Sequence, residues 1–401
     1  MSEAAPTPSR PTDRRTRAIA PDVARGLVLL GIAVANVVYF LVDRQYGILY
    51  RPIGGTEADT ATNVISALLF DNRSFPLFAL LFGYGITQIA RREFDVGTPW
   101  PQTRTLLLRR NLFLILFGAV HGIFIFFGDV IGTYGLLGLA LVLLVRASLR
   151  VLVIVGGAAA VMFVFLASAD GLSGVLTESG VVTTLFPSVG ADSYLQATGL
   201  RAIEWGATLI SVPFGGIGLL APMIIGLAAA RYRVLEEPWK HRRLLVRVAA
   251  IGLPVSLLGA IPVALSLAGA VDWGLGGDVG VAVLHGVSGL VGAVAYVAVI
   301  ALIVGRERTP AGGPIARAFA ALGKRSLSGY LAQSVVFLFV FAPYFGGLGL
   351  TAGVAQATVI AVGVWLATLV AANILEAANR PGPAEWLLRK LVYGKRERRK
   401  P

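Results

Sequence analysis

Two histidines, His121 and His285, stand inside apolar stretches of the chain, where an ionisable side chain is costly and is therefore a candidate for function. Imidazole titrates near neutral pH, so either could act as a general base. Asp129 follows His121 by eight residues, and a continuous helix would hold the two about 12 Å apart. They can pair only if the chain bends at Gly122 or Gly128, and Asp129 could instead cap the helix that follows it.

Other polar residues interrupt apolar stretches at similar depth. Asp71 and Arg73 break a run that restarts at Phe75-Pro76, and Asn36 lies in the middle of another run. We expect His285 and His121 to share one depth, each about 10 Å below the same membrane surface. A purely structural role stays open for each residue. A membrane histidine can simply hydrogen-bond to a neighbouring helix, and arginine can extend to lipid headgroups.

Basic residues open several apolar runs at their other ends. They are Arg25, the pair Arg109-Arg110, and Arg325 of the pair Lys324-Arg325. Such clusters usually fix the orientation of a membrane protein, and they can also bind the phosphates of a cytosolic donor.

The composition shows which elements must position these residues. Hydrophobic residues make up 56% of the 401-residue chain and charged residues only 14%, against about 25% in soluble domains. This composition excludes a soluble enzyme, a nucleic-acid-binding domain and a disordered chain. The chain has no cysteine, three histidines and no HExxH spacing, so neither a metal site nor a permanently bound cofactor is expected.

Apolar runs of spanning length predict an all-α, polytopic bundle with about ten transmembrane helices. The bundle should cover residues 23–378, between a disordered tail at 1–22 and a basic tail at 379–401. Outer loops are expected at about 43–62 and 169–205. The predicted spans are 24–42, 74–90, 107–127, 130–145, 151–168, 206–230, 244–270, 279–304, 326–342 and 352–373, with a short interfacial helix before the second.

The distribution of charge predicts the orientation. With the N-terminus in the cytoplasm, 31 of the 35 Lys and Arg residues fall in cytoplasmic segments, and the exceptions are Arg44, Arg51, Arg73 and Arg201. Both termini should therefore be cytoplasmic. The net charge of +13 then anchors the inner face to the bilayer, and no nucleic-acid partner is required.

Five ordered motifs, spread over about residues 17–396, resemble those of the bacterial DUF418 family, also called YeiB-like. They are Asp22-x-x-Arg25-Gly26 with Leu30-Gly31-Ile32 and Asn36; Phe78-Ala79-Leu80-Leu81-Phe82-Gly83-Tyr84-Gly85; Arg109-Arg110 with Gly118-x-x-His121 and Gly128-Asp129-Val130-Ile131-x-x-Tyr134-Gly135; Gly323-Lys324-Arg325-Ser326 through Ser334; and Gly382-Pro383-x-Glu385-Trp386-Leu387-x-Arg389-x-Leu391-x-Tyr393-Gly394.

The family is grouped with transmembrane acyltransferases, including the lysosomal heparan glucosaminide acetyltransferase. The resemblance implies a multi-pass protein of the bacterial cell membrane that passes an acyl group from cytosolic acyl-CoA to an extracytoplasmic hydroxyl or amine. His121 and Asp129 would be catalytic. Substrate would contact Arg73, Asp71, His285, Asn36 and Tyr134, and the donor would contact Arg25, Arg109, Arg110 and Arg325.

The acceptor could be a small molecule, an envelope glycan or a lipid, and the sequence leaves the oligomeric state open. The alternative function is a transporter or exporter of a small or lipidic molecule, which would use the same broken helix and buried polar groups without chemistry.

Overall fold

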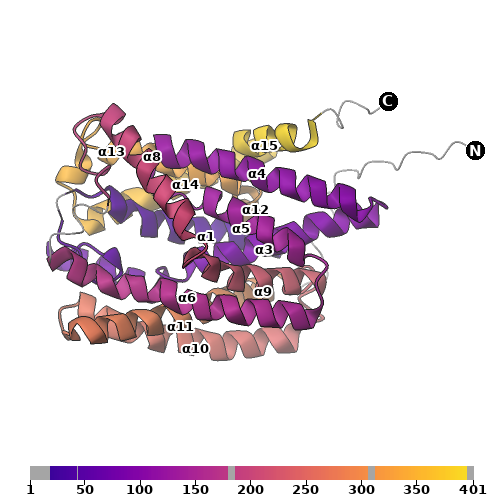
Figure 1. Ribbon diagram of the computed structural model, residues 1–401, viewed down its shortest axis with the longest axis horizontal. Helices are drawn as coiled ribbons and strands as arrows, with labels where there is room; N and C mark the ends of the chain where they lie inside the picture. Colours follow the sequence, from indigo (N-terminus) through magenta and orange to yellow (C-terminus); the bar gives the residue numbers. More distant parts are fainter. Residues whose placement is uncertain (1–18, 43, 179–185, 306–311, 395–401) are drawn as a thin grey trace, which may run out of the picture.

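The computed structural model describes residues 19–42, 44–178, 186–305 and 312–394, and this part of the chain is helical and contains no strand. The long elements lie roughly parallel (Figure 1). The α-helices are α1 (Ala20–Val37), α2 (Glu57–Leu69), α3 (Ser74–Asp95), α4 (Trp100–Phe124), α5 (Ile131–Leu144), α6 (Leu149–Glu178), α8 (Tyr194–Ser211), α9 (Leu220–Arg231), α10 (Arg242–Leu267), α11 (Gly274–Val304), α12 (Pro314–Gly323), α13 (Ser326–Phe341), α14 (Val354–Ala377) and α15 (Pro383–Tyr393).

The prediction of an all-α membrane-spanning bundle is confirmed, and the structure refines the number of spans. Seven helices of the described chain are long and apolar enough to cross a membrane, or eight if the bent pair α8–α9 is one span. Two further apolar helices, α5 and α13, are shorter than a typical span. All ten predicted ranges fall on these helices. A count of ten spans requires that the bent pair α8–α9 is one span and that the short helices α5 and α13 are spans as well.

The predicted span 206–230 is bent. Helix α8 ends at Ser211, and the segment from Gly216 to Arg231 sets off at 69° to it. Pro213 cannot donate a backbone hydrogen bond, and Gly215 and Gly216 add conformational freedom, so a helix is expected to break there.

A second break separates α2 from α3, where the sequence predicts a short helix leading into a span. Thr56 caps α2 through a reciprocal pair of hydrogen bonds with Asp59. Asn72, in the turn between the helices, has a φ of 55°, which asparagine tolerates better than most residues. The break turns the backbone carbonyls of the turn toward the interior of the bundle.

Glycines bring helix α11 close to this break. A Cβ added at Gly289 would lie 2.3 Å from the carbonyl oxygen of Asn72, and one at Gly292 would lie 2.1 Å from Oγ of Ser256 on α10. Small residues thus let three elements approach at backbone distance, which is how membrane helices pack without a hydrophobic driving force.

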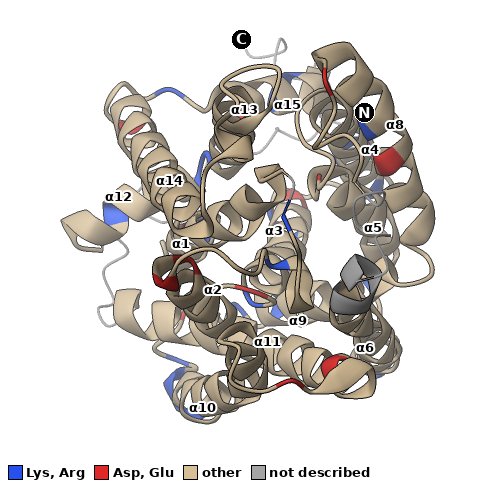
Figure 2. Ribbon diagram, turned by 90° about the vertical axis from the view of Figure 1, so that its left-hand side faces the viewer, with Lys and Arg blue, Asp and Glu red and all other residues tan. Residues whose placement is uncertain are grey.

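Contacts between elements define the two ends of the bundle. At one end, the start of α1 packs on α12, and Glu385 of α15 accepts hydrogen bonds from the first residues of α13. At the other, Arg44 bonds to the carbonyl oxygen of Ala352, and Arg201 bonds to Tyr344. We call these the α15 end and the α8 end. Seen from the α8 end, α3 lies at the centre and α10, α14 and α8 at the periphery (Figure 2).

The outer loops and tails are more helical than expected. Helix α2 occupies part of 43–62, and α6 and α8 occupy both ends of 169–205. The basic tail begins with helix α15, while residues 395–401 lie outside the described chain. Most of the predicted disordered tail, residues 1–18, is also outside it, and α1 begins within the remainder at Ala20.

Candidate functional site

His121 and Asp129 form a buried pair near the α8 end. Nδ1 of His121 lies 2.8 Å from Oδ1 of Asp129, and both side chains are fully shielded from solvent. The same carboxylate accepts hydrogen bonds from the backbone N–H groups of Ile131 and Gly132, at 3.1 and 2.7 Å. Both sequence interpretations of Asp129 are therefore correct, because it caps α5 and also pairs with the histidine.

The pair exists because α4 ends three residues after His121. The carbonyl oxygen of His121 accepts from the backbone N–H groups of both Ile125 and Phe126, which closes the helix. The chain then turns back into α5. Gly118 makes the return close, since a Cβ there would lie 2.2 Å from the backbone nitrogen of Gly132. The chain therefore bends after the end of α4, and this bend brings His121 and Asp129 together although eight residues separate them.

The other ring nitrogen of His121, Nε2, is buried and has no hydrogen-bond partner among the described residues. The Tyr330 ring lies 5.0 Å from the imidazole, centroid to centroid, and the Phe126 ring 6.2 Å away. Gln333, one turn beyond Tyr330 on α13, has both amide atoms buried without a partner in the described chain. Such groups usually mark a place for a ligand or an ordered water.

The contacts of Asp129 suit a neutral imidazole that donates from Nδ1. Asp129 accepts from two backbone N–H groups, and in this tautomer Nδ1 of His121 donates to the same carboxylate. The lone pair of Nε2 is then free, as required of a general base oriented by an acid.

Arg73 and His285 lie in a second network, at the α2–α3 break. The fully buried Arg73 guanidinium donates to the carbonyl oxygens of Ala67, Asp71 and Ser256, at 3.0, 2.7 and 2.7 Å. It also donates to Oγ of Ser256 at 2.9 Å. Arg73 thus ties the break to α10 rather than extending to lipid headgroups.

His285 has a protein partner at each ring nitrogen. Nε2 lies 2.8 Å from the carbonyl oxygen of Ala67 and Nδ1 lies 3.1 Å from the amide nitrogen of Asn72, whose N–H also donates to Asp170. Nη1 of Arg73 also lies 3.1 Å from Nε2, so the histidine is held by the break from both sides of its ring. The two histidines belong to separate networks, and His285 serves to hold α11 against the break.

The other three residues predicted to bind substrate, Asp71, Tyr134 and Asn36, differ in their hydrogen-bond partners. Asp71 is ion-paired with the buried Arg51. The Tyr134 hydroxyl donates to the carbonyl oxygen of Phe75 at 2.8 Å. Asn36 lies beside Tyr330, although no hydrogen bond of normal geometry reaches the buried Tyr330 hydroxyl from any described residue.

At the α15 end, the four predicted donor-binding arginines differ. Arg325 is held by Glu376 and the carbonyl oxygen of Ala321, and Arg25 bonds to Asp22 and the carbonyl oxygen of Leu81. Arg109 is exposed.

Arg110 lies over the Phe82 ring, and its buried Nη1 has no partner in the described part of the chain. It is close enough to Arg25 for their charges to interact. Burial raises the pKa of the nearby Tyr393 hydroxyl, so that group stays neutral.

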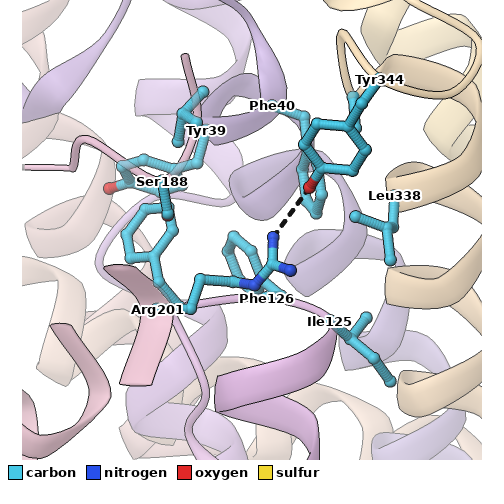
Figure 3. Close-up of a pocket in the computed structure, with 11 residues that line it drawn as sticks. Tyr39, Phe40, Ile125, Phe126, Ser188, Arg201, Leu338 and Tyr344 are labelled. Carbon is cyan, nitrogen blue, oxygen red and sulfur yellow. Dashed lines mark hydrogen bonds between the residues drawn. The ribbon is translucent and has the colours of Figure 1, made fainter. Parts of the chain in front are cut away.

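Three buried polar residues near the His–Asp pair, Arg201, Tyr330 and Gln333, are not among the candidate site residues predicted from the sequence. Arg201 of α8 is buried and points into a small cavity beside the His121 loop (Figure 3). One signal could have found it, since Arg201 is one of the four basic residues outside the predicted cytoplasmic segments. Three of these four are buried in the structure, the other two being Arg51 and Arg73.

The fold and this site define a multi-pass α-helical membrane protein with a buried His–Asp pair at one end. Residues 229–395 match the family model described as "Protein of unknown function (DUF418)". The chain is 26% identical over 415 residues to the uncharacterized protein YxaH of Bacillus subtilis (strain 168), with 96% of each chain covered. It is 27% identical over 391 residues to the uncharacterized protein YeiB of Escherichia coli (strain K12), covering 94% of this chain and 96% of YeiB.

These similarities confirm the resemblance to the DUF418, YeiB-like family. The family model covers α10 to α15 and therefore includes Tyr330 and Gln333 of the site. The His–Asp pair lies outside the matched segment, within the alignment to the two relatives.

Proposed function

We propose that the protein is a membrane acyltransferase of the bacterial cell membrane that passes an acyl group from acyl-CoA to a hydroxyl or amine. The observation that supports this is the His121–Asp129 pair, in which Nε2 of the histidine is buried, unpartnered within the described chain and beside Tyr330. A base held in this way matches what deprotonation of an acceptor requires.

The proposed reaction needs no other reagent. The acceptor O–H or N–H gives its proton to Nε2 of His121 as its oxygen or nitrogen bonds to the thioester carbonyl carbon. The carbon–sulfur bond then breaks, and the proton passes from the imidazolium to the departing thiolate to give free CoA. Asp129 stabilises the transient imidazolium through Nδ1.

Arg110 is the best candidate for the donor phosphates. It is eleven residues before His121 on α4, about 16 Å along the helix, a length comparable to an extended pantetheine arm. Its unpartnered Nη1 and the neighbouring charge of Arg25 would favour an anion at the α15 end. One helix would then carry both the phosphate contact and the base.

Transfer of radiolabel tests the proposal. Purified protein is incubated with labelled acetyl-CoA and an extract of envelope lipids and glycans, and the labelled product is measured. The wild type should transfer label and His121→Ala should not, whereas His241→Ala, which changes a histidine in the loop before α10, should match the wild type. Absence of transfer and of acetyl-CoA binding at millimolar concentration would overturn the acyltransferase proposal.

A transporter is the second candidate, and the break between α2 and α3, where Arg73 is buried, supports it. Broken helices at buried polar groups are typical of transporter binding sites. The two candidates differ in one measurement, since a transporter would move a solute across a vesicle membrane without consuming acyl-CoA.

A further inference from the structure

The cavity beside the His121 loop has aromatic walls and one buried cation. Its lining includes Tyr39, Phe40, Phe126, Phe127 and Tyr344, and the Arg201 guanidinium points into the space among them (Figure 3). The cavity joins the end of α1, the loop after α4, α8 and the end of α13.

Among the described residues, no carboxylate pairs with the charge of Arg201. Its side chain donates to the carbonyl oxygen of Ile123 at 3.0 Å, to the Tyr344 hydroxyl at 2.9 Å and to Oγ1 of Thr198 at 3.2 Å. All three acceptors are neutral, and Arg201 forms no ion pair with a carboxylate of the described residues. Because arginine has five N–H groups, two remain for a ligand.

The nearest acidic residue on α8 is hydrogen-bonded to a different residue. Glu204, one turn after Arg201, accepts from the backbone N–H of Ser188 at 3.0 Å and from its hydroxyl at 2.6 Å. This contact holds Ser188 at the cavity wall. A buried cation without a carboxylate is costly, and an anion bound beside it offsets that cost.

The cavity lies next to the proposed reaction site. Arg201 bonds to the carbonyl oxygen of Ile123, two residues after His121, and Phe126 both lines the cavity and lies against the imidazole. A ligand seated on Arg201 is thus separated from the base by one aromatic ring.

We propose that this cavity binds one small anionic group, a carboxylate or phosphate, and that it is the acceptor subsite. The identification as an acceptor subsite rests on the proposed acyltransferase function, but the selectivity for an anion does not. The cavity encloses about 20 Å³, which is room for a small anionic group alone, and the two remaining N–H groups of Arg201 bind that anion.

Binding of matched small molecules tests the proposal without any donor. The probes are acetate and inorganic phosphate, with neutral acetamide for comparison, and affinity is measured by calorimetry on purified protein at low salt. The wild type should bind at least one anion about ten-fold or more tightly than the amide. Equal affinity for the anions and the amide would overturn the proposal.

Variants assign the selectivity to this cavity. Arg201→Gln should lose the preference for the anion, and Arg201→Lys, which keeps the charge, should retain part of it if the glutamine variant does not fold. Arg44→Gln is the matched control, since Arg44 also bonds backbone carbonyls at the α8 end but does not line the cavity. Unchanged preference in both Arg201 variants would contradict the proposal.

Two further measurements separate the sources of the anion and the two proposals. Phosphatidylglycerol adducts in native mass spectra that are lost in Arg201→Gln would identify a lipid headgroup, and anion binding without such adducts would identify a free solute. His121→Ala should still bind the anion. Selective binding without acyl transfer would therefore retain the anion site and refute only its role as an acceptor subsite.

Discussion

Nδ1 of His121 lies 2.8 Å from Oδ1 of Asp129, although a continuous helix would hold these residues about 12 Å apart. The end of α4 at Phe124 and the immediate return into α5 bring them together. Asp129 therefore has two roles that mutation can separate, capping α5 and orienting the imidazole.

Asp129→Asn tests the orientation of the base. Asparagine is a good helix cap, so the fold should persist, while loss of the negative charge should lower acyl transfer by about 10-fold or more. His121→Ala should lower it by about 100-fold or more, since it removes the base. Transfer of labelled acetyl groups is the measurement, and full activity in His121→Ala would exclude His121 as the base.

Arg110 and Arg109 form a matched pair for donor binding. Arg110 has a buried, unpartnered nitrogen in the described structure, whereas Arg109 is exposed. Arg110→Gln should weaken acetyl-CoA binding by about ten-fold or more, as expected for a charge-assisted contact worth about 1.5–3 kcal/mol. Arg109→Gln should change it little. Calorimetry measures both, and equal effects would argue against a specific phosphate site at Arg110.

The orientation can be tested because the chain has no cysteine. Single cysteines at the exposed Asp192 and Asp272 should react with an impermeant maleimide in intact cells, because the positive-inside pattern puts them outside. Cysteines at His241 and Arg243 should react only after the cells are opened. Labelling of the second pair in intact cells would reverse the assignment.

Helix α11 should be sensitive to added volume where it meets the α2–α3 break. Gly289→Ala places a Cβ 2.3 Å from a backbone oxygen and should lower the free energy of unfolding by about 1–3 kcal/mol. Gly280→Ala on the same helix meets nothing within 4 Å and should be neutral or stabilising by up to about 1 kcal/mol. Unfolding in detergent compares them, and equal stability would disprove the close approach.

The prediction from sequence succeeded where the signal is local. Hydropathy depends on a run of neighbouring residues, so all ten predicted ranges fall on helices of the structure. The break before α3 was also visible, because Asp71, Asn72 and Arg73 interrupt an apolar run.

The sequence by itself thus determined the class of protein, the approximate spans and the candidate base His121. Tertiary structure decided which polar groups meet, because that depends on where each helix ends and how closely the helices pack. It placed His121 beside Asp129 and gave both ring nitrogens of His285 a hydrogen-bond partner. It also directed the Arg201 side chain into a cavity with aromatic walls. Hydropathy does not indicate in which direction a side chain points. Residues from α1, α4, α8 and α13 become neighbours only after the helices have packed.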